Sequence, residues 1–283
     1  MKIGTMVHLD ETTPMHIEKV KQYGLESCQL VCWDMTKFTD ENAASVVAAS
    51  REYGIEISAL WCGWEGEAVW NFIDGYHTLG LVPLRTRKKR IENLKSGSDF
   101  AKKINVSHVV THMGFLPENP NTDEYSCVVE AIREIAEYCK NNGQYLLFET
   151  GQETPITLLR TILTVNTGNL GINLDPANLL LYGKANPCDA LDVFGKYVMG
   201  VHAKDGEYPT DPLYLGQEKR IGDGRANFPL LIEKLKKLGY DNKISIIHDS
   251  ATRLLTIERE ISGEKQVQDI LYAKKFLEEL ING

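Results

Sequence analysis

Short runs of hydrophobic residues alternate along this chain with longer stretches in which hydrophobic residues recur every three to four positions. The short runs have the length of buried strands, and the longer stretches have the period of amphipathic helices. This alternation is typical of a parallel sheet covered by helices. Eight strands are predicted, at residues 2–7, 27–32, 56–61, 108–112, 145–149, 171–175, 198–202 and within 243–260. Closed on themselves, eight such units form a (β/α)8 barrel, an α/β fold that we predict for residues 1–283 as a single domain.

Two of the intervening stretches show the helical pattern clearly. Between the fourth and fifth strands, the predicted buried face consists of Val128, Ile132, Ile135, Ala136 and Cys139. A later helix is predicted to bury Phe228, Leu231, Leu235 and Leu238. Helix starts are predicted at Thr13-Pro14 and Thr154-Pro155, because a threonine hydroxyl accepts a free helical N–H and proline has none to satisfy.

One segment departs from the alternation. Residues 63–83 form a long irregular stretch that contains Trp64, Trp70 and Phe72. Long loops in compact domains tend to be functional, so we predict that this insertion is a lid over the catalytic end of the barrel. Its tryptophans, together with Trp61, would either stack against a bound ligand or pack on the barrel, and packing is the commoner role.

Composition and charge narrow the classes of partner. Of the 283 residues, 43% are hydrophobic and 25% are charged, which is ordinary for a globular protein. A net charge of -8 argues against nucleic acid as a partner. We find no secretory signal pattern and no apolar run of roughly 20 residues, so we expect a cytoplasmic protein that does not enter the membrane. The six cysteines contain no CxxC pair, so we expect reduced and mostly buried thiols.

Four of the predicted strands end on, or just before, a carboxylate or an imidazole. Strands of a parallel barrel are buried on both faces, so a charged residue at a strand end needs a physical reason. The four residues are Glu149, Asp175, His202 and Glu258. In a barrel all the carboxyl ends of the strands meet at one rim, where catalytic residues of this architecture collect. We therefore expect these four side chains to converge.

Three converging carboxylates would repel one another, whereas a divalent cation would turn them and the imidazole into a ligand set. Mostly oxygen ligation favours Mn2+ or Mg2+, with Co2+ or Zn2+ as alternatives. The competing interpretation is that each acid caps a helix just past its strand and that His202 is a satisfied core histidine. The recurrence on successive strands favours a site for one metal ion.

Five segments around these residues resemble, in order, recurrent segments of the xylose isomerase-like TIM barrel superfamily, specifically its sugar phosphate isomerase/epimerase group. The segments are residues 148–153, 173–178, 201–205, 221–224 and 256–260. The resemblance covers nearly the whole chain. It implies that Glu149, Asp175, His202 and Glu258 bind one metal ion, and that the two glutamates also carry protons in an epimerase.

The same resemblance implies contacts with a small-molecule carbohydrate substrate. His112 matches a fourth-strand histidine that lies near substrate or a second metal in relatives, although a buried histidine bonded to backbone fits its position equally well. We also expect Trp61, Lys204 and Gln152 to contact the substrate. The resemblance leaves a homo-oligomer open.

The last strand can be placed in two ways. Family members usually pass from Gly-Tyr-Asp almost directly into this strand, whereas here additional residues follow Asp241. A strand at residues 243–248 would offer His248 or Asp249 to the metal. A strand that ends at Glu258 matches the family segment and reaches the last helix through a short loop, as βα units do. We therefore predict that Glu258 completes the ligand set.

The expected activity is that of a metal-dependent isomerase or epimerase of a ketose, a related polyol or a sugar phosphate, acting by proton transfer through a metal-stabilised enediolate. A polyol dehydratase-type lyase shares the first step, and a non-catalytic sugar-binding barrel is a further alternative. The endonuclease branch of the superfamily is disfavoured because residues 205–224 contain no Asp-x-His pair. Gly222-Asp223-Gly224 is interpreted as a turn rather than a phosphate cradle.

Overall fold

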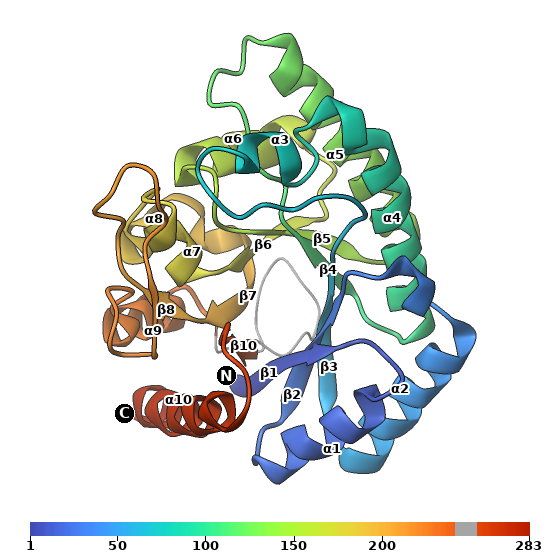
Figure 1. The fold of residues 1–283 in the computed structure, drawn as a ribbon, viewed down its shortest axis with the longest axis vertical. Helices are drawn as coiled ribbons and strands as arrows, with labels where there is room; N and C mark the ends of the chain where they lie inside the picture. The colour runs from blue at the N-terminus through green and yellow to red at the C-terminus, as the bar shows by residue number, and fades with distance from the viewer. Residues whose placement is uncertain (241–253) are drawn as a thin grey trace.

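The computed structural model describes residues 1–240 and 254–283, and its central feature is a closed barrel of parallel strands (Figure 1). The barrel strands are β1 Lys2–His8, β2 Ser27–Cys32, β3 Glu56–Cys62, β4 His108–Thr111, β5 Tyr145–Glu149, β6 Leu170–Leu174, β7 Val198–Ala203 and β10 Leu254–Ile257. β10 pairs in parallel with both β1 and β7, which closes the barrel. The predicted (β/α)8 fold is confirmed, and the first seven strands lie within about one residue of their predicted bounds.

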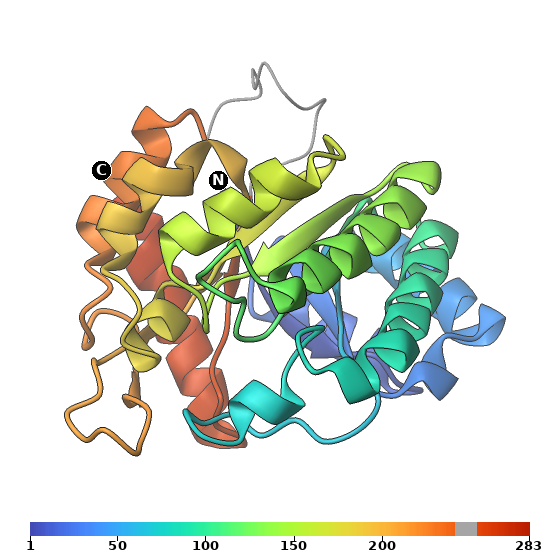
Figure 2. The ribbon, with the colours of Figure 1, turned by 90° about the horizontal axis from the view of Figure 1, so that it is seen from above.

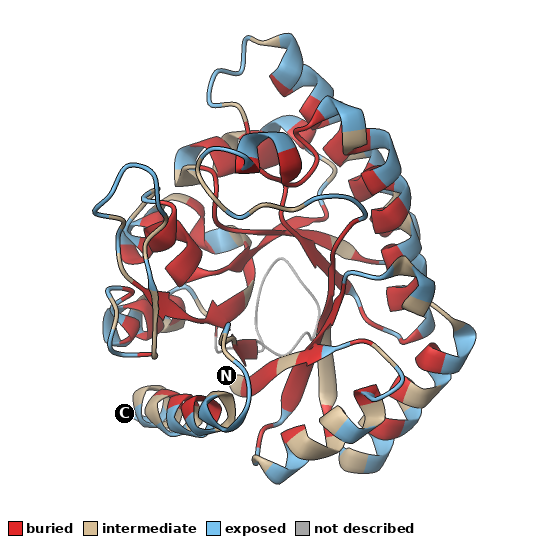
Figure 3. Ribbon diagram, in the orientation of Figure 1, coloured by how far each residue is buried: buried red, intermediate tan, exposed pale blue. Residues whose placement is uncertain are grey.

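Helices surround the barrel on its outer side, as the end-on view and the perpendicular view both show (Figures 1 and 2). They are α1 Thr13–Gln22, α2 Asp40–Tyr53, α3 Gly75–Thr78, α4 Leu84–Lys103, α5 Asp123–Asn141, α6 Pro155–Val165, α7 Pro176–Leu181, α8 Pro187–Phe194, α9 Phe228–Lys237 and α10 Glu264–Asn282, with short 3-10 turns η1 Met35–Lys37 and η2 Gly195–Tyr197. Each long helix turns a buried face to the strands and an exposed face outward (Figure 3). This division follows from the three-to-four spacing of its apolar residues.

Most of the predicted helical details hold, with two exceptions. All five residues predicted for the inner face of α5 are buried, and the Thr154 hydroxyl caps α6 by accepting the Thr157 N–H. The prediction for Leu238 is wrong, because α9 ends one residue earlier and the Leu238 side chain is 47% exposed. Thr13 does not cap α1 either, since its hydroxyl accepts the Asp10 N–H at 2.8 Å in the preceding turn.

A layer of apolar side chains fills the barrel interior below its carboxyl end. It consists of Val31, Ala59, Trp61, Val110, Leu147 and Met199, with Met6 packed against it. Side chains two positions apart on a strand point to the same side. The alternation that directs Val110 and Leu147 inward therefore places His112 and Glu149 one layer nearer the rim. The polar site consequently rests on a packed apolar layer.

Two buried arginines of α4 form hydrogen bonds to the backbone of residues 63–83. Arg90 donates to the Gly80 carbonyl at 2.7 Å, and Arg87 donates to the Leu81 carbonyl at 2.6 Å. Gly80 has φ +66, and a Cβ there would lie 2.0 Å from the carbonyl carbon of Met113, so this close backbone approach requires glycine. Figure 2 shows this segment, in teal, at the same end of the barrel as the orange loop that follows β7. Its role as a lid remains a prediction.

A two-stranded antiparallel sheet, β8 Asp205–Gly206 and β9 Glu218–Lys219, extends the loop after β7. The Asp205 carboxylate accepts the backbone N–H groups of Gly222, Gly224 and Ala226 at 3.0, 3.2 and 2.9 Å. The N–H groups that a phosphate cradle would need are thus bonded within the chain. Residues 222–224 form a turn around Asp205.

The cysteines agree with the expectation of mostly buried thiols. All six cysteines are free thiols, and all but Cys127 are buried. Burial raises the pKa of Cys28 to about 12, which makes it an inert packing residue. Among the described residues, no helix is both long and apolar enough to cross a bilayer.

Candidate functional site

Glu149, Asp175, His202 and Glu258 converge at the carboxyl end of the barrel. Each offers one potential ligand atom, and these atoms lie within 4.8 Å of one another. Glu149 ends β5, Asp175 follows β6, His202 lies on β7 and Glu258 follows β10. The structure therefore brings together all four residues named from the sequence. The alternative ligands His248 and Asp249 lie outside the described residues.

In its neutral form, the imidazole of His202 presents the lone pair of Nδ1 to the three carboxylates. Its Nε2 lies 2.7 Å from Oε1 of Gln29, and because an amide oxygen can only accept, Nε2 carries the proton of the neutral ring. The other nitrogen, Nδ1, lies 2.7 Å from Oε2 of Glu258 and 3.3 Å from Oε1 of Glu149. Lone pairs that face one another in a buried site are unfavourable without a cation between them.

The hydrogen bonds of the cluster also favour a cation between these side chains. When the His202 ring is neutral, the buried atoms Asp175 Oδ2, His202 Nδ1 and Glu258 Oε2 have no hydrogen-bond partner within the described residues, although Nδ1 and Oε2 lie 2.7 Å apart. Buried polar atoms are rarely left unpartnered, so three such atoms directed at one point require an explanation. One nitrogen and several carboxylate oxygens are a donor set that suits a divalent ion. This group could hold a metal ion.

The pKa values in the cluster indicate which of its side chains carry a proton when no ion is bound. Burial raises the pKa of Asp175 to about 6, although Lys204 opposes this shift. Burial disfavours a charge on His202, but Glu149 and Glu258 outweigh it and raise its pKa well above the usual range. In the same way Lys204 and His202 overcome burial and lower the pKa of Glu258 to about 2. An ion that binds here must therefore displace a proton from His202.

The two carboxylate oxygens of Asp175 are placed so that one caps a helix and the other belongs to the cluster. Its Oδ1 accepts the Asn178 N–H at 2.8 Å and so caps α7, which begins at Pro176. Its Oδ2 faces the cluster, 3.7 Å from His202 Nδ1. A carboxylate has enough lone pairs for both contacts. The cap orients the side chain and leaves its second oxygen available.

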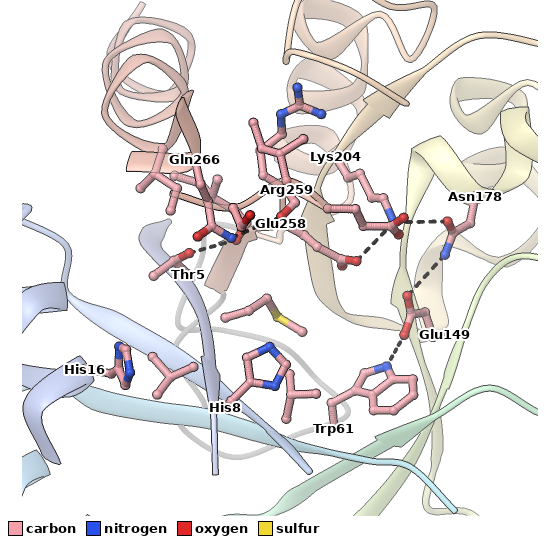
Figure 4. A pocket seen from close by; sticks show the side chains of 18 of the residues that line it. Thr5, His8, His16, Trp61, Glu149, Asn178, Lys204, Glu258, Arg259 and Gln266 are labelled. Carbon is pink, nitrogen blue, oxygen red and sulfur yellow. Dashed lines mark hydrogen bonds and ion pairs between the residues drawn. The ribbon is translucent and has the colours of Figure 1, made fainter. Parts of the chain in front are cut away.

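The Glu149 carboxylate is contacted at both of its oxygens (Figure 4). The indole N–H of Trp61 donates to Oε2. The side-chain amide of Asn178 donates to Oε1 at 3.2 Å, and His112 Nε2 lies 3.3 Å from the same oxygen. Although burial opposes it, the nearby His112 and His202 lower the pKa of Glu149 well below its ordinary value.

Lys204 is a buried cation beside Glu258. Its ammonium lies 3.0 Å from Oε1 of Glu258, forms an ion pair with Glu260 and lies 3.5 Å from Oδ1 of Asn178. Burial alone would lower the pKa of Lys204, but Glu258 and Asp175 raise it well above the usual range. Figure 4 shows the resulting line of contacts from Trp61 through Glu149, Asn178 and Lys204.

A cavity of about 820 Å3 opens above the cluster. Its volume is within the range of roughly 300–1,000 Å3 that is usual for small-molecule sites. Glu149 and Glu258 line it, and so do Trp33, Trp61 and Trp70. Trp70 comes from the segment 63–83, and its ring centroid lies 5.0 Å from that of His112. The insertion therefore supplies part of the cavity wall.

The predicted substrate contacts divide into two groups. His112, Trp61 and Lys204 line the cavity. Gln152 is buried and is not among the lining residues, and both polar atoms of its amide have no hydrogen-bond partner within the described residues. Substrate contact by any of the four remains a prediction.

Three residues of the site were not singled out from the sequence. Gln29 orients His202, Asn178 bonds to Glu149, and Glu260 pairs with Lys204. Gln29 left a recognisable signal, since it is a large polar residue in the middle of a fully buried strand. Asn178 and Glu260 lie just past strand ends, where polar residues are common and carry little information.

Comparison with known proteins places this geometry in a family. The family model described as xylose isomerase-like TIM barrel matches residues 17–269. The crystal structure of a xylose isomerase domain protein from Planctomyces limnophilus is 32% identical, with a TM-score of 0.89 over 99% of this chain and 96% of that chain. A D-tagatose 3-epimerase-like protein is 23% identical, with a TM-score of 0.74 over 100% and 97% of the two chains.

A relative of undetermined function is similar in sequence along nearly the whole chain. An uncharacterised protein from Methanocaldococcus jannaschii is 24% identical over 294 residues, which covers 99% of this chain and 89% of that protein. Among the surrounding helices, the match of the family model leaves out only the first turn of α1 and the greater part of α10. This chain belongs to the xylose isomerase-like TIM barrel family.

Proposed function

We propose that this protein is a metal-dependent isomerase or epimerase of a ketose or a related polyol, with Glu149 and Glu258 as its proton-transferring residues. The observation that carries the proposal is the position of these two carboxylates. Both belong to the four-residue cluster and both line the cavity. They come from strands separated by β6 and β7, so they reach a bound substrate from different directions.

The structural neighbours support this class of reaction. Proteins of the same fold include a D-psicose 3-epimerase crystallised with D-fructose and the D-tagatose 3-epimerase-like protein. A further neighbour, from Mycobacterium smegmatis, is described in complex with magnesium. These similarities concern the fold, and the complete donor set in this chain is what extends the proposal to its activity. It also argues against a sugar-binding barrel without activity.

Glu149, Asp175, His202 and Glu258 would hold one divalent ion, with Mn2+ or Mg2+ preferred over Co2+ or Zn2+. When bound, the ion would supply the positive charge that polarises a substrate carbonyl. Gln29 would fix the tautomer of neutral His202 by accepting from Nε2, so that Nδ1 is the nitrogen that coordinates once its proton has been displaced. The helix cap on Oδ1 would hold Asp175 in the same orientation with or without substrate.

The two glutamates would divide the proton transfer between them. One removes the proton from the carbon next to the carbonyl, and the other returns a proton to the opposite face, which inverts that centre. Lys204 and Asn178 connect the two carboxylates, and the Lys204 ammonium neutralises part of their charge. The indole and imidazole rings around the cavity would exclude water from the exposed carbanion-like carbon.

A dehydratase-type lyase is the second candidate. A probable 3-DHS dehydratase from Bacillus anthracis shares the fold, and proton removal next to a carbonyl is a step common to both reactions. The two candidates differ in the fate of the substrate. An epimerase or isomerase conserves the molecular formula, whereas a dehydratase releases water.

Solvent-deuterium exchange tests the proposal directly. Wild-type protein with Mn2+ or Mg2+ is incubated in D2O with D-psicose, D-tagatose and D-fructose, and the products are analysed by NMR and mass spectrometry. Deuterium at the carbon next to the carbonyl is expected for at least one ketose. Glu149→Gln should keep the fold and abolish this exchange, because an amide can coordinate weakly but cannot act as a base.

Glu153→Gln is the matched control. Glu153 is a buried glutamate in the loop after β5, and it is not part of the cluster. This variant should retain exchange. Exchange at the wild-type rate in Glu149→Gln would remove Glu149 from the mechanism. A product that has lost water would favour the lyase, and no exchange with any ketose would contradict the isomerase proposal.

A further inference from the structure

Trp61 lies at the carboxyl end of a barrel strand, next to the candidate site. It lies near the end of β3, where it pairs with Val31 of β2 and Val110 of β4, and it is 5% exposed. Its ring packs against Trp33, with centroids 4.9 Å apart, and against Trp64, with centroids 6.2 Å apart. These contacts leave the indole little freedom to move, so the direction of its N–H is set by the barrel itself.

That N–H is directed at Oε2 of Glu149. We propose that Trp61 is a positioning residue whose indole N–H fixes the orientation of the Glu149 carboxylate for proton transfer, rather than a platform on which a sugar stacks. This inference rests on the proposed role of Glu149 as an acid/base group. The proposed role depends on the indole N–H and not on the surface of the ring.

The contacts of the carboxylate explain why such a donor matters. The terminal torsion of a glutamate has a broad energy profile, so the carboxylate plane is poorly defined by the side chain itself. Oε1 is 3.3 Å from His202 Nδ1 on the cluster side and accepts from Asn178. A donor on Oε2 therefore defines the plane from the opposite end. A carboxylate oxygen keeps a second acceptor direction when one N–H is bound.

A fixed plane affects the rate more than the affinity. A base that is displaced from its reacting geometry by about 1 Å can lose roughly a hundredfold in rate. The metal-facing oxygen would still be held by its other neighbours without Trp61. We therefore expect loss of the indole N–H to reduce kcat and to leave metal content and KM nearly unchanged.

Trp64 provides a matched control within the same aromatic cluster. It is 2% exposed, it also packs on Trp33, and its indole N–H has no hydrogen-bond partner within the described residues. Phenylalanine at either position keeps most of the ring packing and removes one indole N–H. The two variants therefore differ mainly in whether the lost N–H was bonded to Glu149.

The contact can be tested without any substrate. The chain has four tryptophans, Trp33, Trp61, Trp64 and Trp70. Protein labelled with 15N-tryptophan should give an indole N–H resonance for each, assigned by single replacements with phenylalanine. Glu149→Gln should shift the Trp61 resonance and leave that of Trp64 in place. An unmoved Trp61 resonance would overturn the proposal, even if Trp61→Phe itself did not fold.

Kinetics on the ketose that wild-type protein exchanges most rapidly then separates positioning from stacking. Trp61→Phe should lower kcat about ten- to a hundredfold, with KM and metal content within about twofold of wild type. Trp64→Phe should stay close to wild type. A raised KM with unchanged kcat in Trp61→Phe would identify a stacking platform and overturn the proposal. If no ketose is exchanged, the proposed function fails, whereas the resonance shift still decides the contact.

Discussion

Asp175 uses its two carboxylate oxygens for different purposes. Oδ1 caps α7 through the Asn178 N–H, and Oδ2 faces His202 in the cluster. A substitution that removes the whole carboxylate therefore combines a loss of helix stability with a loss of the proposed ligand. A substitution that keeps a capping oxygen separates the two effects, because asparagine caps helices about as well as aspartate.

We predict that Asp175→Asn loses most of the bound metal while remaining as stable as metal-free wild type. Asp175→Ala should lose the metal and about 1 kcal/mol of stability as well, since it also lacks the cap. Metal content is measured by plasma mass spectrometry, and stability by urea unfolding in the presence of chelator. About one divalent ion per chain is expected for wild type. Unchanged metal content in both variants would refute the assigned site.

Glu153 is a second buried carboxyl whose environment has measurable consequences. Burial raises its pKa to about 7, and its Oε1 has no hydrogen-bond partner within the described residues. The folded protein therefore binds this proton more tightly than the unfolded chain does. Glu153 contributes most to stability at pH values below the ordinary range of glutamate, and this contribution is lost as pH rises through about 7.

Glu153→Gln should make the protein more stable than wild type at pH 8 and give little gain at pH 4.5. The expected difference in unfolding free energy between the two pH values is roughly 3 kcal/mol, because each pKa unit corresponds to about 1.36 kcal/mol. Urea unfolding of both proteins across this pH range measures it. A stability difference that does not change with pH would show that the Glu153 carboxyl is not perturbed in the folded state.

At the level of secondary structure, some helices begin with a threonine whose hydroxyl caps the first turn, and α1 begins with a threonine that does not cap. The hydroxyls of Thr39, Thr122 and Thr154 accept a backbone N–H in the first turn of α2, α5 and α6. At α1 the residue before the helix is Thr12, and its hydroxyl does not cap. A threonine therefore stands at the N-cap of both α1 and α6, but only the Thr154 hydroxyl caps its helix.

Thr154→Ala should lower the free energy of unfolding by about 1 kcal/mol, because a first-turn N–H of α6 loses its acceptor. Thr12→Ala serves as the control and should change stability by less than about 0.5 kcal/mol, as is usual for exposed positions. Both are measured by urea unfolding. Equal losses in the two variants would mean that the cap of α6 does not determine the difference.

At the level of the whole molecule, the four clustered residues belong to or follow β5, β6, β7 and β10. β10 also pairs with β1, so these strands include the closure of the barrel. An ion bound to all four residues would link one side of the barrel to the strand that closes it. Since such a site exists only in the folded chain, binding free energy adds to folding stability.

Addition of Mn2+ or Mg2+ to metal-free protein should therefore raise the melting temperature. At a free metal concentration a hundred times Kd the gain is about 2.7 kcal/mol, or roughly 5 °C or more for a domain of this size. Asp175→Asn should show no such increase at the same concentration. Scanning calorimetry measures both proteins, and equal increases would place the stabilising ion elsewhere on the molecule.

Local patterns in the sequence determined the secondary structure and the membership of the cluster. Strand bounds, the buried face of α5 and the Thr154 cap depend on residues a few positions apart, so periodicity and capping rules predicted them. The convergence of Glu149, Asp175, His202 and Glu258 followed from a property of the fold, because parallel strands present their carboxyl ends at one rim.

Tertiary structure alone decided what each side chain at that rim contacts. Trp61 bonds to Glu149, Gln29 to His202 and Glu260 to Lys204, and in each pair the partners come from different strands or loops. Gln152 shares a short loop with the site and yet is absent from the cavity wall. Such contacts depend on strand register and barrel closure, which bring together residues far apart in the chain. No pattern within a single segment contains that information.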